Sequence, residues 1–116
     1  MSLKYISIPN GITTMNDGSE FSYSNALERI MLTGTITALN IYSHRACTGL
    51  LEVVIPSSIE TIGKEAFYQC YSLLYVDIPE GVTTIGESAF ALNRAMSYVI
   101  IPSTITTIGK TAFNNC

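Results

Sequence analysis

One segment occurs three times in this chain, and it constrains the fold more than any other feature. The copies are IPSSIETIGKEAFYQC at 55–70, IPEGVTTIGESAFALN at 78–93 and IPSTITTIGKTAFNNC at 101–116. The second copy begins as far after the first as the third begins after the second. A fixed period of about 20 to 50 residues is typical of repeat proteins, in which each unit packs against its neighbours. The sequence therefore predicts a solenoid.

The period covers the whole chain when the last hydrophobic residue of each predicted strand is aligned. These residues are Ile8, Leu32, Ile55, Ile78 and Ile101, and the first step between them is slightly longer than the other three, which are equal. Apolar residues also stand two positions earlier, at Ile6, Ile30, Val53, Val76 and Val99, and five positions earlier, at Leu3, Leu27, Leu50, Leu73 and Met96. The resulting pattern, Leu-x-x-Val-x-Ile, is rich in β-branched residues and favours a strand in each unit.

Proline follows the strand in four of the five units, at Pro9, Pro56, Pro79 and Pro102, with Thr33 in its place in the second. Because proline has no N–H, it ends the hydrogen-bond ladder at that point. We therefore expect about five repeats, approximately 3–26, 27–49, 50–72, 73–95 and 96–116, in a single repeat domain.

The second half of each unit carries another apolar pair, then Gly or Asn, then Ala-Phe in the last three units. The pairs are Ile12/Met15, Ile36/Leu39, Ile59/Ile62, Val82/Ile85 and Ile105/Ile108, followed by Asn16, Asn40, Gly63, Gly86 and Gly109. Gly and Asn accept a positive φ most readily, which predicts a left-handed bend at this position. Phe67, Phe90 and Phe113 are expected to fill the interior, with Phe21 equivalent in the first unit and Ser43-His44 in the second.

Composition and charge exclude several classes of protein. The net charge is −3 and the six basic residues are scattered singly, whereas a nucleic-acid binder needs a clustered basic surface. No segment approaches the length of about 18 apolar residues that a membrane helix needs. The N-terminus, MSLKYISIPNG, lacks the charged and apolar regions of a signal peptide. Either the protein is not exported by that route, or this chain is a piece of something longer.

The residue types that carry chemistry do not form a known catalytic or metal-binding pattern. Cys47, Cys70 and Cys116 recur at multiples of the repeat length, with Asn93 in the remaining position, whereas zinc sites need close pairs of ligands. His44, just before Cys47, is the single histidine. We expect stacked, reduced cysteines in a structural role, although a disulfide between Cys47 and Cys70 is sterically conceivable. The sequence predicts no enzyme activity, no cofactor and no metal site.

The residues between the core positions of each strand are expected to face outward in two columns. One column holds Tyr5, Arg29, Glu52, Tyr75 and Tyr98, and the other holds Ser7, Met31, Val54, Asp77 and Ile100. Tyr and Arg are enriched where proteins bind one another, so these columns, without Ser7, form the candidate ligand-binding site. The same residues also suit a second interpretation, in which they pack across the sheet or against a neighbouring domain.

The repeated pattern L-x-x-V-x-I-P-x-x-I-x-x-I-G-x-x-A-F-x-x-C resembles the BspA-type leucine-rich repeat, closely over 50–116 and in its apolar skeleton over 1–49. The resemblance implies a solenoid with a parallel β-sheet on the inner face and short strands, loops or helical turns on the outer side. It also implies a bacterial or protist surface protein, secreted or at the cell surface, that adheres to protein or glycan ligands.

The last repeat is expected to expose hydrophobic residues, because Ile105, Ile108 and Phe113 would have no neighbour on their far side. Solenoids usually end in polar capping repeats, and the pattern shows none at either end. We therefore expect a fragment of a longer array that associates end to end when isolated. An alternative function follows, as a structural spacer or assembly segment of a larger surface or phage protein.

Overall fold

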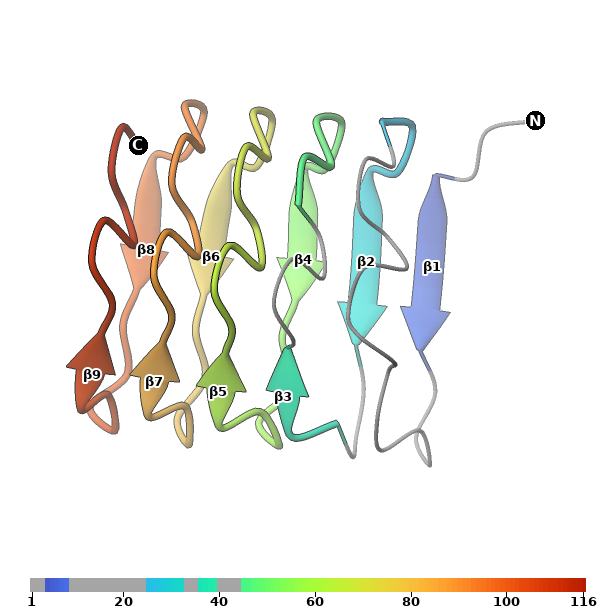
Figure 1. Ribbon diagram of the computed structural model, residues 1–116. Coiled ribbons are helices and arrows are strands. Elements are labelled where there is room, and N and C mark those ends of the chain that lie inside the picture. Colours follow the sequence, from blue (N-terminus) through green and yellow to red (C-terminus); the bar gives the residue numbers. More distant parts are fainter. Residues whose placement is uncertain (1–3, 9–24, 33–35, 40–44) are drawn as a thin grey trace.

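The chain forms a coil of short β-strands whose successive turns stack side by side (Figure 1). This computed structural model describes residues 4–8, 25–32, 36–39 and 45–116. The strands of one row are β1 (Tyr5–Ile8), β2 (Arg29–Leu32), β4 (Glu52–Val54), β6 (Tyr75–Asp77) and β8 (Tyr98–Ile100). A second row runs in the opposite direction and contains β3 (Ala38–Leu39), β5 (Thr61–Ile62), β7 (Thr84–Ile85) and β9 (Thr107–Ile108). The described residues form no helix, so strands and turns make both sides of the coil.

The strand pairings follow the predicted repeat. Tyr5 pairs with Arg29, Arg29 with Glu52, and Tyr75 with Tyr98, all in parallel register. The second row pairs Thr61 with Thr84 and Thr84 with Thr107 in the same way. Each pairing joins residues that the sequence alignment treats as equivalent. The predicted parallel solenoid, with one unit of the sequence pattern in each turn, is therefore confirmed.

The core lies between the two rows and consists of the residues that recur at the predicted apolar positions. Leu50, Val53 and Ile55 are buried in one turn, as are their counterparts Leu73, Val76 and Ile78 in the next. The rings of Phe67 and Phe90 stack with centroids 5.3 Å apart, and those of Phe90 and Phe113 with centroids 5.5 Å apart. The predictions for Ile12/Met15, Phe21 and Ser43-His44 concern positions outside the described residues.

The predicted left-handed bend at Gly63, Gly86 and Gly109 is wrong. Of the glycines in the described part of the chain, Gly81 alone has a left-handed φ, at 107°. A Cβ on Gly86 would instead lie 2.6 Å from the backbone nitrogen of Lys64, in the previous turn. Glycine is needed here because neighbouring backbones approach too closely for a side chain. The prediction for Asn16 and Asn40 lies outside the described residues.

Residues with a left-handed φ instead stand two and six positions after each of these glycines. They are Glu65 and Gln69, Ser88 and Leu92, and Thr111 and Asn115, with φ between 52° and 63°. They bracket the Ala-Phe segment, which forms a third ladder between turns. Its N–H groups donate to the following turn, as from Phe67 to the Ala89 carbonyl at 2.7 Å and from Phe90 to the Ala112 carbonyl at 2.8 Å. This ladder holds the phenylalanine rings in register.

The cysteine column forms a chain of hydrogen bonds, and this explains why Asn93 fits a cysteine position. The backbone of Cys47 forms a hydrogen bond with the Cys70 thiol, and the backbone of Asn93 forms one with the Cys116 thiol. Between them, the Cys70 N–H donates to Asn93 Oδ1 at 2.8 Å. Asn93, which is fully buried, therefore supplies a hydrogen-bond acceptor at the position where other turns have a thiol.

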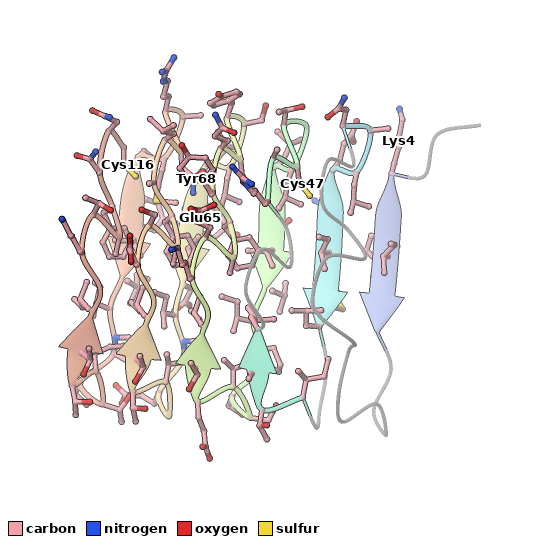
Figure 2. The ribbon with its side chains drawn as sticks, viewed as in Figure 1. Lys4, Cys47, Glu65, Tyr68 and Cys116 are labelled. Atoms are coloured by element: carbon pink, nitrogen blue, oxygen red, sulfur yellow. The ribbon has the colours of Figure 1, made fainter. Side chains whose placement is uncertain are left out.

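Cys47 and Cys70 are buried thiols, and burial raises the pKa of Cys70. Cys116 is exposed at the C-terminal end of the column (Figure 2).

The last turn leaves apolar side chains uncovered, as the sequence predicted. Ile108 is 48% exposed, whereas Ile62 and Ile85, at the same position of earlier turns, are fully buried. Ile101 is also exposed, and Phe113 is only partly buried against the core. We call the apolar surface formed by Ile101, Ile105, Ile108 and Phe113 the C-terminal surface.

Candidate functional site

The candidate site lies on the outward side of the row formed by β1, β2, β4, β6 and β8. We call this surface the strand face; its members are Tyr5, Arg29, Met31, Glu52, Val54, Tyr75, Asp77, Tyr98 and Ile100. The strand pairings place these residues in the two predicted columns, with Met31 beside Val54 and Asp77 beside Ile100. Tyr5, Met31, Val54, Tyr98 and Ile100 are each between 37% and 53% exposed. The structure therefore brings all of these side chains to one surface.

Glu52 connects the neighbouring turns on the strand face. Its Oε2 lies 3.3 Å from Arg29 Nε on one side, and its Oε1 accepts a hydrogen bond from the Tyr75 hydroxyl at 3.2 Å on the other. The carboxylate of Glu52 raises the pKa of Tyr75, chiefly because its negative charge disfavours the phenolate and also because it accepts this hydrogen bond. Both Glu52 oxygens therefore already have donors.

Aromatic side chains also pack against one another along the first column. The rings of Tyr75 and Tyr98 stack with centroids 5.3 Å apart and planes 13° from parallel. Nearer the N-terminus, the Tyr5 hydroxyl lies 3.8 Å from Met31 Sδ. These side chains therefore pack across the sheet, as the second interpretation expected. Several of them are also exposed to solvent.

The first row is interrupted between β4 and β6. Strands β1, β2 and β4 form one sheet, and β6 and β8 form another. At the entrance to the gap, the Leu74 N–H donates to the Leu51 carbonyl at 3.3 Å, but Glu52–Val54 and Tyr75–Asp77 are not paired as neighbouring strands of one sheet. The same two turns stay joined in the second row, where β5 pairs with β7. The break in strand pairing is therefore confined to the row that carries the strand face.

Two hollows flank β4 on this surface. One, of about 310 Å³, lies over the gap between β4 and β6, and it is bordered by Glu52, Val53 and Val54 together with Tyr75, Asp77 and Pro79. We call it the β4/β6 hollow. The other, of about 130 Å³, lies towards β1 and β2, and Tyr5, Arg29 and Met31 border it. Glu52 and Val54 are common to both hollows.

Some exposed apolar residues next to the strand face were not among the predicted site residues. Leu51 and Leu74 are 41% and 49% exposed at the start of β4 and β6, and Tyr71 nearby is 39% exposed. The sequence does carry a signal for the leucines, because each directly follows a buried core leucine, Leu50 or Leu73. A second adjacent leucine exceeds what the core pattern needs.

The described residues do not assemble a metal site or a membrane span. Within the described ranges, no three His, Cys, Asp or Glu side chains are grouped to hold a metal ion. A search of the same residues finds no helix long and apolar enough to cross a membrane. His44, the single histidine of the sequence, lies outside these residues.

Comparison with known proteins identifies the repeat. A family model described as the BspA type leucine rich repeat region matches residues 1–116 in six copies. A leucine-rich repeat protein from Bacteroides ovatus has a similar structure, with a TM-score of 0.84 and 26% identity over 98% of this chain and 35% of that chain. A leucine rich cell surface protein from Faecalibacterium prausnitzii gives a TM-score of 0.58 and 22% identity over 100% of this chain and 46% of that chain. No curated protein matches. The chain thus spans less than half the length of either solved structure.

Proposed function

The chain belongs to the BspA-type leucine-rich repeat family, and we propose that it is a non-enzymatic adhesion module that binds protein or glycan ligands through the strand face. The observation that supports this function is the exposure of tyrosine, arginine and aliphatic side chains around two hollows on one surface. Aromatic and arginine side chains of this kind dominate binding energy in protein interfaces. A location at the cell surface or outside the cell agrees with the cell surface protein from Faecalibacterium prausnitzii among its structural relatives.

The double substitution Tyr75→Ser/Tyr98→Ser tests this function. We expect binding to a panel of immobilised secreted proteins and glycans to weaken by about tenfold or more, since hot-spot residues contribute upwards of about 1.4 kcal/mol. Tyr71→Ser is the matched control, because Tyr71 is exposed outside the strand face, where its ring lies under Arg94. Circular dichroism checks that the variants remain folded. Binding that the double substitution leaves unchanged, or that Tyr71→Ser reduces equally, would contradict the proposal.

A second candidate function, as an assembly segment that associates end to end, is favoured by the C-terminal surface. There Ile108 is 48% exposed on a turn whose counterparts are buried. We expect the mass measured by light scattering to rise with protein concentration, and Ile108→Ser to suppress that rise. Ile100→Ser provides the control, because Ile100 is 50% exposed but lies on the strand face. A measured mass equal to that of a single chain at all concentrations would contradict this second candidate.

A further inference from the structure

We propose that the last turn of one chain binds the first turn of a second copy, so that chains join head to tail and the coil continues across the junction. This inference rests on the end-to-end association proposed as the second candidate function, and it names the partner surface and the register of contact. It follows from the backbone groups of the last turn, from the side chains that would meet and from the charges of the two end repeats.

The last turn carries backbone N–H groups without an acceptor among the described residues. In the turn before it, the equivalent groups donate to the following turn, as from Ser88 to the Lys110 carbonyl at 3.0 Å and from Leu92 to the Asn114 carbonyl at 2.8 Å. The corresponding donors of the last turn are the N–H groups of Thr111, Phe113 and Asn115. No described residue accepts a hydrogen bond from them. A further turn that supplied acceptors would stabilise them.

The same turn also carries backbone acceptors without a donor among the described residues. Along the first row, the Leu51 carbonyl accepts from the Leu74 N–H at 3.3 Å, and the Leu74 carbonyl accepts from the Ser97 N–H at 2.9 Å. The Ser97 carbonyl comes next in this series, and no described donor reaches it. In the second row, the Thr83 carbonyl accepts from Thr106 at 2.9 Å, and the Thr106 carbonyl is open in the same way. The last turn thus presents both donors and acceptors to a further turn.

The first turn of a second copy carries a matching donor. The Lys4 N–H stands at the position from which the N–H groups of Leu51, Leu74 and Ser97 donate to the preceding turn. It has no acceptor among the described residues. If the second copy follows the last turn in the same register, its Lys4 N–H donates to the Ser97 carbonyl. Strand β1 of the second copy then pairs with β8, as β2 pairs with β1 within one chain.

The side chains that this register brings together are complementary. Tyr98, whose ring stacks on that of Tyr75, would meet Tyr5 of the second copy and extend the stack by one ring. Val99 would meet Ile6, and each of these two side chains is partly buried against the core of its own chain. Aromatic and β-branched pairs across neighbouring strands stabilise a sheet. The junction would therefore repeat the contacts that already hold the turns together.

The charges of the two end repeats have opposite signs. The last repeat (96–116) contains one charged residue, Lys110, whereas the first repeat (3–26) contains Lys4 together with Asp17 and Glu20. Surfaces of opposite net charge favour association, and surfaces of like charge oppose it. The charges therefore favour a junction between the last and the first turn over a junction between two C-terminal surfaces.

Such a junction uses a different surface on each copy, and it leaves one surface of each kind free on the complex. Strands β1 and β8 lie at opposite ends of their row, so a third chain can add in the same way as the second (Figure 1). Heterologous contacts of this kind build assemblies that do not stop at two chains. The mass should rise with concentration beyond that of a dimer.

Mixing two variants, each blocked at one end, tests the inference by sedimentation velocity. Ile108→Asp places a charge on the C-terminal surface, and Tyr5→Asp places one on the first turn, where Tyr5 is 48% exposed. Because burying an unpaired charge is unfavourable, each variant alone should associate more weakly than the unaltered chain by about tenfold or more. An equimolar mixture should restore complexes of two chains and no larger ones, because one intact end of each kind remains.

Val54→Asp is the matched control. Val54 is 41% exposed on β4, in the middle of the row, so the same charge there should leave the association within about twofold of the unaltered chain. Ile6→Asp is a second first-turn variant that should behave as Tyr5→Asp does, and circular dichroism checks that all variants remain folded.

Hydrogen exchange gives a second measurement. The amides of Thr111, Phe113 and Asn115 should exchange more slowly by about tenfold when the protein is concentrated, because the second copy covers them. The Phe90 amide, which donates to the Ala112 carbonyl within one chain, should not change.

Association of the Tyr5→Asp protein at the strength of the unaltered chain would overturn the inference, because C-terminal surfaces would then be joining one another. A mixture of the Tyr5→Asp and Ile108→Asp proteins that keeps the mass of a single chain would also overturn it. Both outcomes differ from a failure of the proposed association, in which the unaltered chain itself keeps the mass of a single chain at every concentration.

Discussion

Phe90→Ala is expected to lower the free energy of unfolding by about 3–5 kcal/mol, the range for removing a buried phenylalanine. Phe90 is fully buried, and its ring stacks on Phe67 on one side and on Phe113 on the other. Truncation would leave a cavity inside one turn and separate the rings on both sides of it. Because each turn is stabilised mainly by its neighbours, the damage extends to both interfaces. Urea denaturation followed by circular dichroism measures the loss.

Phe113→Ala is the control for this effect. Phe113 is only partly buried and stacks on one ring among the described residues, so its truncation should cost clearly less than that of Phe90. Equal losses for the two variants, or a loss at Phe90 below about 1 kcal/mol, would show that the stack is not a major source of stability.

Gly86→Ala should destabilise the protein by about 1–3 kcal/mol, the range for forcing extra volume into a packed interior. The added methyl group would lie 2.6 Å from Lys64 N and 2.7 Å from the carbonyl carbon of Gly63. Backbone atoms of the previous turn cannot move aside as a flexible side chain can. Relief of the clash therefore requires the two turns to separate where β5 and β7 end. Thermal and urea denaturation would report the loss of stability.

Asn115→Gly is the comparison at a position where the backbone conformation, and not a lack of space, would favour glycine. Asn115 has a left-handed φ of 58° and an exposed side chain, so glycine fits there without a clash. Its effect should stay within about 0.5 kcal/mol, as for most surface substitutions. A neutral Gly86→Ala would mean that the close approach of the backbones is not what requires glycine.

The strands and the core could be predicted from the sequence because a single period controls both. Once Ile55, Ile78 and Ile101 are aligned, alternation within each strand decides which side chains point inward. The placement of Tyr75 beside Tyr98 and of Arg29 beside Glu52 followed from the same alignment. Their role in binding a ligand remains a prediction.

The reason for the glycines and the gap between β4 and β6 could not be predicted in this way. A preference for glycine fits both a left-handed bend and a close approach, and only the position of the Lys64 backbone distinguishes the two. The gap involves turns that carry the same pattern as the others, so no residue marks it. Likewise, Asn93 looks like a departure from the pattern until the direction of the Cys70 N–H is known.

The pairing of equivalent residues in successive turns also governs how the length of such a protein can change during evolution. Removing one residue from a strand would move every later side chain of that strand to the opposite face, burying polar groups and exposing the core. Removing or duplicating a whole turn, such as 73–95, would return each column to the same register. Tandem duplication in steps of one turn therefore lengthens the coil without a new folding solution. Outward positions such as Asp77 and Ile100 remain free to diversify from copy to copy.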